Sequence, residues 1–135
     1  MLREVSRKGC VKMKTLFVSV PMKGRTEEEI KKSIDKMKKI AEIYEGEELQ
    51  LIDSYVEHKP PQDSKEEIWY LSKSIEKLAK ADLFIGIQGD WLWSGCEIER
   101  NVAQRYGIKT YSVDATYVVD NYLELLREME HVCPI

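Results

Sequence analysis

Hydrophobic and polar positions follow two distinct patterns along the chain. Four short apolar runs, rich in β-branched residues, have the length of buried parallel strands; they cover residues 15–20, 49–52, 82–87 and 109–113. After each run, apolar residues recur at helical spacing over residues 26–46, 64–78, 94–107 and 118–129. Two of these segments begin with capping-box sequences, Thr26-x-x-Glu29 and Ser64-x-x-Glu67. The core face expected for the second helix consists of Ile68, Leu71, Ile75 and Leu78.

Regular alternation of strands and helices is typical of an α/β fold, in which right-handed crossovers make the strands parallel. We predict a single-domain, flavodoxin-like or Rossmann-like parallel sheet of four to five strands, in the order 2-1-3-4, with helices on both faces. The first and third strands then flank the switch point, where loops 21–25 and 88–94 form a ligand cleft. The domain is expected to span residues 14–135, after a flexible polar extension of residues 1–13.

Composition narrows the classes of function. The chain has 24 acidic and 21 basic residues, a formal net charge of −3, and no basic run, which argues against a nucleic acid polymer or a membrane as partner. No apolar run reaches membrane-spanning length, and we expect no signal peptide. Three widely spaced cysteines fit a reducing, cytoplasmic environment. Neither His58 nor His131 has metal-ligand spacing, so we expect no metal site.

The third predicted helix carries two carboxylates that point in different directions. Its apolar positions are Ile98, Val102, Ala103 and Tyr106. At about 100° per residue, Glu99 falls in the middle of this apolar arc, whereas Glu97 lies roughly 160° away among polar side chains. A carboxylate on the inward face requires a partner, a cleft or a catalytic role. Two interpretations of Glu99 stay open: a functional group at the cleft, or a structural ion pair with a buried lysine or arginine.

The loops at the predicted cleft contain other candidate groups. Lys23 and Arg25 follow the first strand and either recognise an anion or are solvated surface cations. Trp91 and Trp93 precede the third helix, and their rings suit stacking on a base. Cys96 has no nearby histidine to activate it, so we interpret it as a small residue beside the site. Phosphate-binding P-loop, dinucleotide-binding and G-x-S-x-G motifs are absent from the sequence.

The chain contains the segments VSVPMKGR, IDSYV, ADLFIGI and SGCEIERNVAQRYGIK. Together, over about residues 14–113, they resemble the nucleoside 2-deoxyribosyltransferase-like superfamily, in particular its small phage and bacterial branch. The resemblance implies that Glu99 is the catalytic glutamate and that Asp82 and Asp90 match acidic residues of the family. The cleft and the resemblance together predict these substrate-binding residues: Pro21, Met22, Lys23, Gly24, Arg25, Trp91, Trp93, Ser94 and Gly95.

The resemblance implies cleavage of an N-glycosidic bond in a (deoxy)nucleoside or a nucleoside 5′-monophosphate. Glu99 would attack the anomeric carbon and form a covalent glycosyl-enzyme intermediate, while Asp82 or Asp90 would protonate the leaving base. Ser94 and Gly95 would help hold a 5′-phosphate. No metal or organic cofactor is implied, and the family's habit of pairing predicts a homodimer or a higher homo-oligomer.

The loop of residues 21–25 departs from the characterised transferases, since it carries two cations where they have aromatic residues. Transfer to a second base and hydrolysis by water therefore both stay open. A non-catalytic nucleotide-binding module on the same fold is the alternative from a different functional class.

Overall fold

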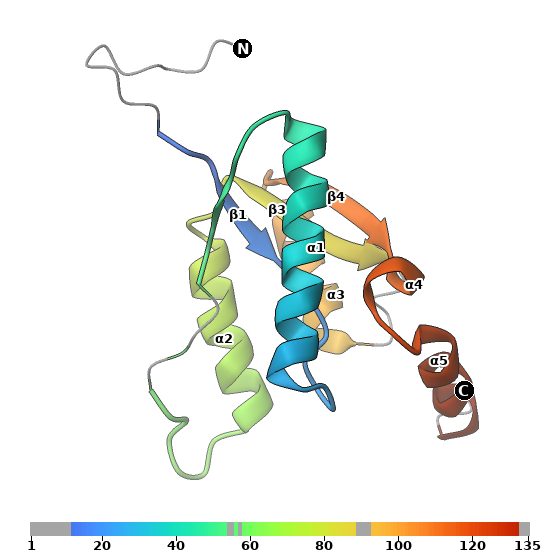
Figure 1. Cartoon of the computed structure of the whole chain (residues 1–135). Coiled ribbons are helices and arrows are strands. Elements are labelled where there is room, and N and C mark those ends of the chain that lie inside the picture. The colour runs from blue at the N-terminus through green and yellow to red at the C-terminus, as the bar shows by residue number, and fades with distance from the viewer. Residues whose placement is uncertain (1–11, 54–55, 57, 89–92, 133–135) are drawn as a thin grey trace.

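The protein is an α/β fold built on a parallel sheet (Figure 1). The computed structural model describes residues 12–53, 56, 58–88 and 93–132. The strands are β1 (Thr15–Val18), β2 (Gln50–Leu51), β3 (Leu83–Gln88) and β4 (Lys109–Asp114). They pair in parallel in the order β2-β1-β3-β4, which confirms the predicted fold class and strand order. The helices are α1 (Glu27–Glu45), α2 (Glu66–Leu78), α3 (Ser94–Arg105), α4 (Ala115–Val118) and α5 (Tyr122–Val132).

Helices cover both faces of the sheet, and a separate apolar cluster lies between the sheet and the helices on each face. In Figure 1, α1 crosses in front of the strands and α3 lies behind them. The cluster beneath α1 and α4 includes Met37, Ile85 and Val113, whereas the cluster beneath α2 and α3 includes Phe84 and Ala103. Alternate residues of β3 point to opposite faces of the sheet. Because helices cover both faces, this central strand is buried along nearly its whole length.

The first predicted capping box is confirmed. The backbone N–H of Glu29 donates to Thr26 Oγ1 at 3.1 Å, and the backbone N–H of Thr26 donates to Glu29 Oε1 at 2.8 Å. Helix α1 ends at Gly46, which adopts a left-handed φ of 76° that glycine tolerates without a steric penalty. This reciprocal cap fixes the start of α1 directly after the loop that follows β1.

The second predicted capping box is wrong. The hydroxyl of Ser64 donates to the carbonyl of Pro61 at 2.6 Å, so it closes a turn, and Lys65 is the N-cap of α2 without a side-chain hydrogen bond. The predicted core face of this helix is only partly right. Leu78 is 1% exposed, but Ile68 is 60% exposed because the first turn of α2 extends beyond the sheet-facing cluster.

The last predicted helix, over residues 118–129, begins later in the structure, as α5 at Tyr122, and the short helix α4 that precedes it was not predicted. Asp114 caps α4, accepting the backbone N–H of Thr116 at 2.9 Å. Asn121 then adopts a φ of 64° and separates α4 from α5. The break lets Val118 and Val119 pack into the cluster beneath α1 before the chain turns into α5.

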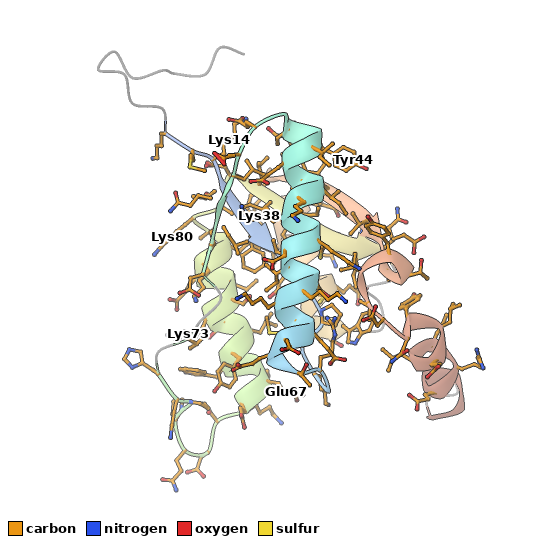
Figure 2. The ribbon with its side chains drawn as sticks, viewed as in Figure 1. Lys14, Lys38, Tyr44, Glu67, Lys73 and Lys80 are labelled. Carbon is orange, nitrogen blue, oxygen red and sulfur yellow. The ribbon has the colours of Figure 1, made fainter. Side chains whose placement is uncertain are left out.

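An ionic cluster lies at the amino edge of the sheet, the end at which the parallel strands begin. Glu45, at the end of α1, contacts Lys14 Nζ at 3.1 Å and Lys109 Nζ at 2.8 Å, and it accepts the hydroxyl of Tyr111. Figure 2 shows Lys14 at this end of the molecule and Glu67 toward the opposite end. The Glu45 side chain is only 4% exposed. Its hydrogen bonds from Lys109 and Tyr111 lower the pKa of the Glu45 carboxyl from 4.5 to about 2, against the opposing effect of burial.

We expect Glu45→Gln to destabilise the fold at pH 7 by about 1–3 kcal/mol. A carboxyl whose pKa is lower in the folded state stabilises that state above pH 4.5, and this contribution is lost as the pH falls from 4.5 toward 2. Urea unfolding at pH 7 and pH 3 should therefore give a smaller difference between variant and wild type at pH 3. Glu48→Gln, at an exposed neighbour, is the control. Equal stability of Glu45→Gln and wild type at pH 7 would contradict the prediction.

Candidate functional site

The carboxyl edge of the sheet brings together polar side chains from three elements around Glu99. Glu99 lies on α3 and points inward, while Glu97 is exposed, as their helical spacing predicts. Ser19, just beyond β1, donates its hydroxyl to Glu99 Oε1 at 2.7 Å. Ser74, on α2, donates its hydroxyl to Glu99 Oε2. Each carboxylate oxygen is thus held by one hydroxyl.

The contacts of Glu99 bear on one of its two interpretations, a structural ion pair with a buried lysine or arginine. Within the described part of the chain, the recorded partners of its carboxylate are the two serine hydroxyls, and neither a lysine nor an arginine pairs with it. Burial raises the pKa of the Glu99 carboxyl above 4.5, although the hydrogen bonds from Ser74 and Ser19 oppose the rise. Glu99 is therefore a desolvated carboxyl group held by neutral donors, and no ion pair among the described residues accounts for its inward position.

The loop after β1 is fixed close to Glu99. The backbone N–H of Ser19 donates to the carbonyl of Ile85 at 2.9 Å, which extends the pairing with β3 beyond the end of β1. Ser19 is 2% exposed, and Val20 and Pro21, which follow it, are also buried. Gly24 then turns the chain with a φ of 75°. Met22, 47% exposed, lies on the outside of this turn.

The two cations of this loop have different roles. The guanidinium of Arg25 donates to the carbonyl of Pro21 at 2.9 Å, to the carbonyl of Glu29 at 3.3 Å and to Ser33 Oγ at 2.6 Å. These contacts fasten the loop to α1 and use three of the five N–H donors of the guanidinium. The ammonium of Lys23 is exposed and 3.8 Å from a carboxylate oxygen of Glu67, an exposed pair that a ligand can displace.

Some residues at the start of α3 pack against the core, whereas others are exposed to solvent. Trp93 is half-buried: it packs on the cluster beneath α1, and its ring centroid lies 6.1 Å from that of Tyr122 at the start of α5. Ser94 and Gly95 are exposed in the first turn of α3. Cys96 is 6% exposed and packs inward beside the site.

The two predicted acids are not brought to Glu99 in the described structure. Asp82 immediately precedes β3, and its Oδ2 accepts the backbone N–H of Thr15 at 2.9 Å. This places Asp82 at the amino edge of the sheet, whereas Glu99 lies at the carboxyl edge beside Ser19. Asp82 therefore joins β1 to β3 and does not reach a leaving base held at Glu99. Asp90, like Trp91, lies outside the described residues.

Sequence reasoning missed both serines that contact Glu99. Ser19 is a hydroxyl inside the apolar run TLFVSV, and Ser74 lies three residues after Leu71 and four before Leu78, on the inward side of α2. The test that singled out Glu99, a polar residue on an apolar face, would have found Ser74 as well.

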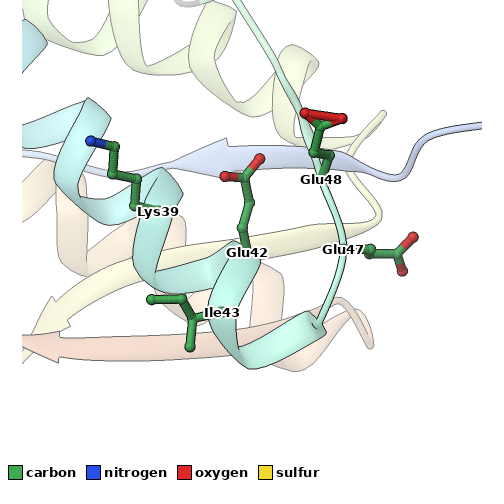
Figure 3. Close-up of a pocket in the computed structure, with 5 residues that line it drawn as sticks. All are labelled: Lys39, Glu42, Ile43, Glu47 and Glu48. Atoms are coloured by element: carbon green, nitrogen blue, oxygen red, sulfur yellow. The ribbon is translucent and has the colours of Figure 1, made fainter.

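A hollow elsewhere on the surface is a poor candidate for the site. It lies beside the end of α1 and is lined by Lys39, Glu42, Ile43, Glu47 and Glu48 (Figure 3). Glu42 is already engaged, because its Oε2 accepts the backbone N–H of Leu49 at 2.9 Å and pairs with Lys38 at 3.2 Å. Its carboxylate therefore caps the turn into β2 and is not free for a ligand.

Comparison with family models, with curated proteins and with solved structures finds no match to this chain. Across the described residues, no helix combines the length and apolar character needed to cross a bilayer. The same residues contain no cluster of three or more histidine, cysteine or acidic side chains arranged to hold a metal ion. The chemistry around Glu99 is therefore the best indication of function.

Proposed function

We propose that the protein cleaves the N-glycosidic bond of a (deoxy)nucleoside or a nucleoside 5′-monophosphate, with Glu99 as the nucleophile. The observation that carries this proposal is the desolvated Glu99 carboxylate, which lies at the carboxyl edge of a parallel sheet and is held only by hydroxyls among the described residues. Burial of a charge without a cationic partner costs stability, and such groups concentrate at functional sites.

The chemistry follows from a carboxylate facing an anomeric carbon. An oxygen of Glu99 forms a bond to C1′ as the bond from C1′ to the base breaks, giving a covalent glycosyl-enzyme intermediate. The electron pair of the broken bond stays on the base, which takes up a proton. Water then attacks C1′ and releases the free sugar and Glu99, or a second base attacks and completes a transfer. Lys23, exposed beside the same edge, is a candidate contact for a 5′-phosphate.

A second candidate function is a nucleotide-binding module without turnover. One observation favours it: the described residues hold no second carboxyl in contact with Glu99, and a leaving base needs a proton. If the protein does cleave the bond, the proton for the leaving base would come from Asp90, which lies outside the described residues, or from water.

A panel of deoxynucleosides and their 5′-monophosphates tests the proposal. We expect the wild type to release free base, detected by chromatography, and Glu99→Gln and Glu99→Ala to lose on the order of 10³-fold or more of this activity. Glu97→Gln, which removes an exposed carboxylate from the same helix, should keep the wild-type rate. Mass spectrometry of a rapidly quenched reaction should find a 2-deoxyribosyl group on the peptide that contains Glu99. Binding of a nucleotide by the wild type with no base released would favour the module instead.

A further inference from the structure

The Glu99 carboxylate is held from two sides by elements that are far apart in sequence. Ser19 comes from the end of β1 and Ser74 from the middle of α2, 80 and 25 residues from Glu99. We propose that these two serines form a hydroxyl clamp: they are positioning residues that hold one carboxylate oxygen each and present Glu99 in a single orientation. The effect of the clamp on turnover rests on the proposed function, whereas its effect on the carboxylate itself does not.

Both arms of the hydroxyl clamp are fixed by contacts of their own. The backbone of Ser19 is tied to β3 through the carbonyl of Ile85 at 2.9 Å. Ser74 lies one turn before Leu78, which is 1% exposed and packs beneath α2. Lys77, in the last turn of the same helix, donates to the carbonyl of Asp53 at 2.7 Å and ties α2 to the end of β2. The two hydroxyls are thus anchored to the sheet by independent routes.

Neutral donors suit a carboxylate that must form a bond. A lysine or arginine in contact would stabilise the anion strongly and lower its pKa, which weakens it as a nucleophile. A hydroxyl makes a single hydrogen bond to an oxygen that has room for a second. Each oxygen of Glu99 therefore keeps a lone pair available for the anomeric carbon while the clamp restricts rotation of the side chain.

The chain provides a matched control for Ser74. Ser72 lies on the same helix, is exposed, and donates its hydroxyl to the carbonyl of Trp69 at 2.6 Å within α2 itself. Ser72→Ala removes a hydroxyl of the same kind without touching Glu99. Ser74→Thr keeps a hydroxyl at the clamp position, so it serves as the conservative rescue.

We expect the ionisation of Glu99 to report on the clamp directly. Carbon-13 NMR of the glutamate carboxyl groups, with the Glu99 signal assigned by its loss in Glu99→Gln, gives the pKa of this one group in each variant. Ser74→Ala and Ser19→Ala should raise the pKa of Glu99 above its wild-type value, since each removes a donor that favours the anion. Ser72→Ala should leave the pKa unchanged, and Ser74→Thr should return it toward the wild-type value.

Turnover provides a second, separable measurement. In Ser74→Ala, kcat for base release should fall about 10- to 100-fold, the range expected for losing a hydrogen bond to a charged group, with a smaller change in KM. The acidic limb of the pH profile should move to higher pH together with the NMR titration. Ser72→Ala should change neither quantity.

The outcomes distinguish failure of the clamp from failure of the proposed function. If Ser74→Ala folds, by circular dichroism, and leaves both the Glu99 titration and its chemical shift unchanged, the hydroxyl clamp is overturned whatever the assay gives. If the titration moves as expected and no protein in the series releases base, the clamp stands and glycosidic cleavage fails. Ser19 is buried, so Ser19→Ala can fail to fold. In that case Ser74→Ala and Ser74→Thr alone test the hydroxyl clamp.

Discussion

Glu99→Gln is expected to make the protein more stable at neutral pH while removing its proposed activity. Burial raises the pKa of the Glu99 carboxyl in the folded state, so that state binds the proton more tightly than the unfolded chain does. Stability therefore falls as the pH rises from 4.5 through the folded-state pKa, and ionised Glu99 lowers stability at all higher pH. Glutamine has the same shape without the charge. Its amide can accept a hydrogen bond from one serine and donate to the other, so both partners in the site stay satisfied.

Thermal and urea unfolding of wild type, Glu99→Gln and Glu97→Gln across pH 4 to 8 measure this effect. The gain for Glu99→Gln should be about 0.5–2 kcal/mol at pH 7.5 and should shrink toward pH 4, where wild-type Glu99 is protonated as well. Glu97→Gln should stay near wild type, because Glu97 is exposed and its charge is solvated. A Glu99→Gln protein that is less stable than wild type at pH 7.5 would mean that the carboxylate contributes to the fold instead of reducing its stability.

Much of the architecture was predictable because the sequence alternates cleanly between two periodicities. Short β-branched runs and amphipathic segments follow one another, and right-handed crossovers leave few ways to arrange them, so the order β2-β1-β3-β4 could be derived. Element ends were harder to place. Both Ser64 and Thr26 begin an S/T-x-x-E sequence, yet the hydroxyl of Ser64 closes a turn with Pro61 instead of capping a helix. A serine at this position can either cap a helix or close a turn, and the geometry of the loop brings its hydroxyl to the carbonyl of Pro61.

Glu99 points inward as its place on the helical wheel predicts, although two of the four apolar positions that defined the inward face, Ile98 at 41% and Tyr106, are exposed. Tyr106 is 81% exposed, because α3 ends at Arg105 and Gly107 turns the chain with a φ of 82°. The inward face is marked instead by Cys96 and Ala103, which are buried on either side of Glu99 in the sequence. Glu99 lies on the same side of the helix, within about 60° of both, so it still points inward.

The acid and the partners of Glu99 illustrate the limit of reasoning from one sequence. The position of Asp82 could have been corrected, because a residue that precedes a parallel strand lies at the amino edge, away from the cleft at the carboxyl edge. The approach of Ser74 could not have been derived, because it depends on how α2 packs beside α3 on the same face of the sheet. Periodicity shows which face of a helix is buried, but it does not show what that face meets.

Phe84→Ala is expected to produce the largest loss of stability of any single change argued from this structure, about 3–5 kcal/mol. Phe84 is completely buried in β3, the central strand that pairs with both β1 and β4. Its ring stacks on that of Phe17, with centroids 5.8 Å apart and planes 8° from parallel. Removing it leaves a cavity in the smaller of the two apolar clusters, where few other large side chains can move in to fill the space. Urea unfolding gives the loss directly.

A substitution at Gly86 gives a second test of the packing around Phe84, because the Phe84 ring occupies the space that a side chain at Gly86 would need. A Cβ added at Gly86 would lie 2.9 Å from Cε1 and 3.2 Å from Cζ of Phe84. Gly86→Ala alone should cost about 1–3 kcal/mol, since a ring stacked on Phe17 cannot shift freely. In the double variant the new methyl group enters the space that the ring has left, so the loss should be smaller than the sum of the two single losses. Gly95→Ala, where an added Cβ meets nothing within 4 Å, should be close to neutral. Strict additivity of Phe84→Ala and Gly86→Ala would show that the ring does not restrict position 86.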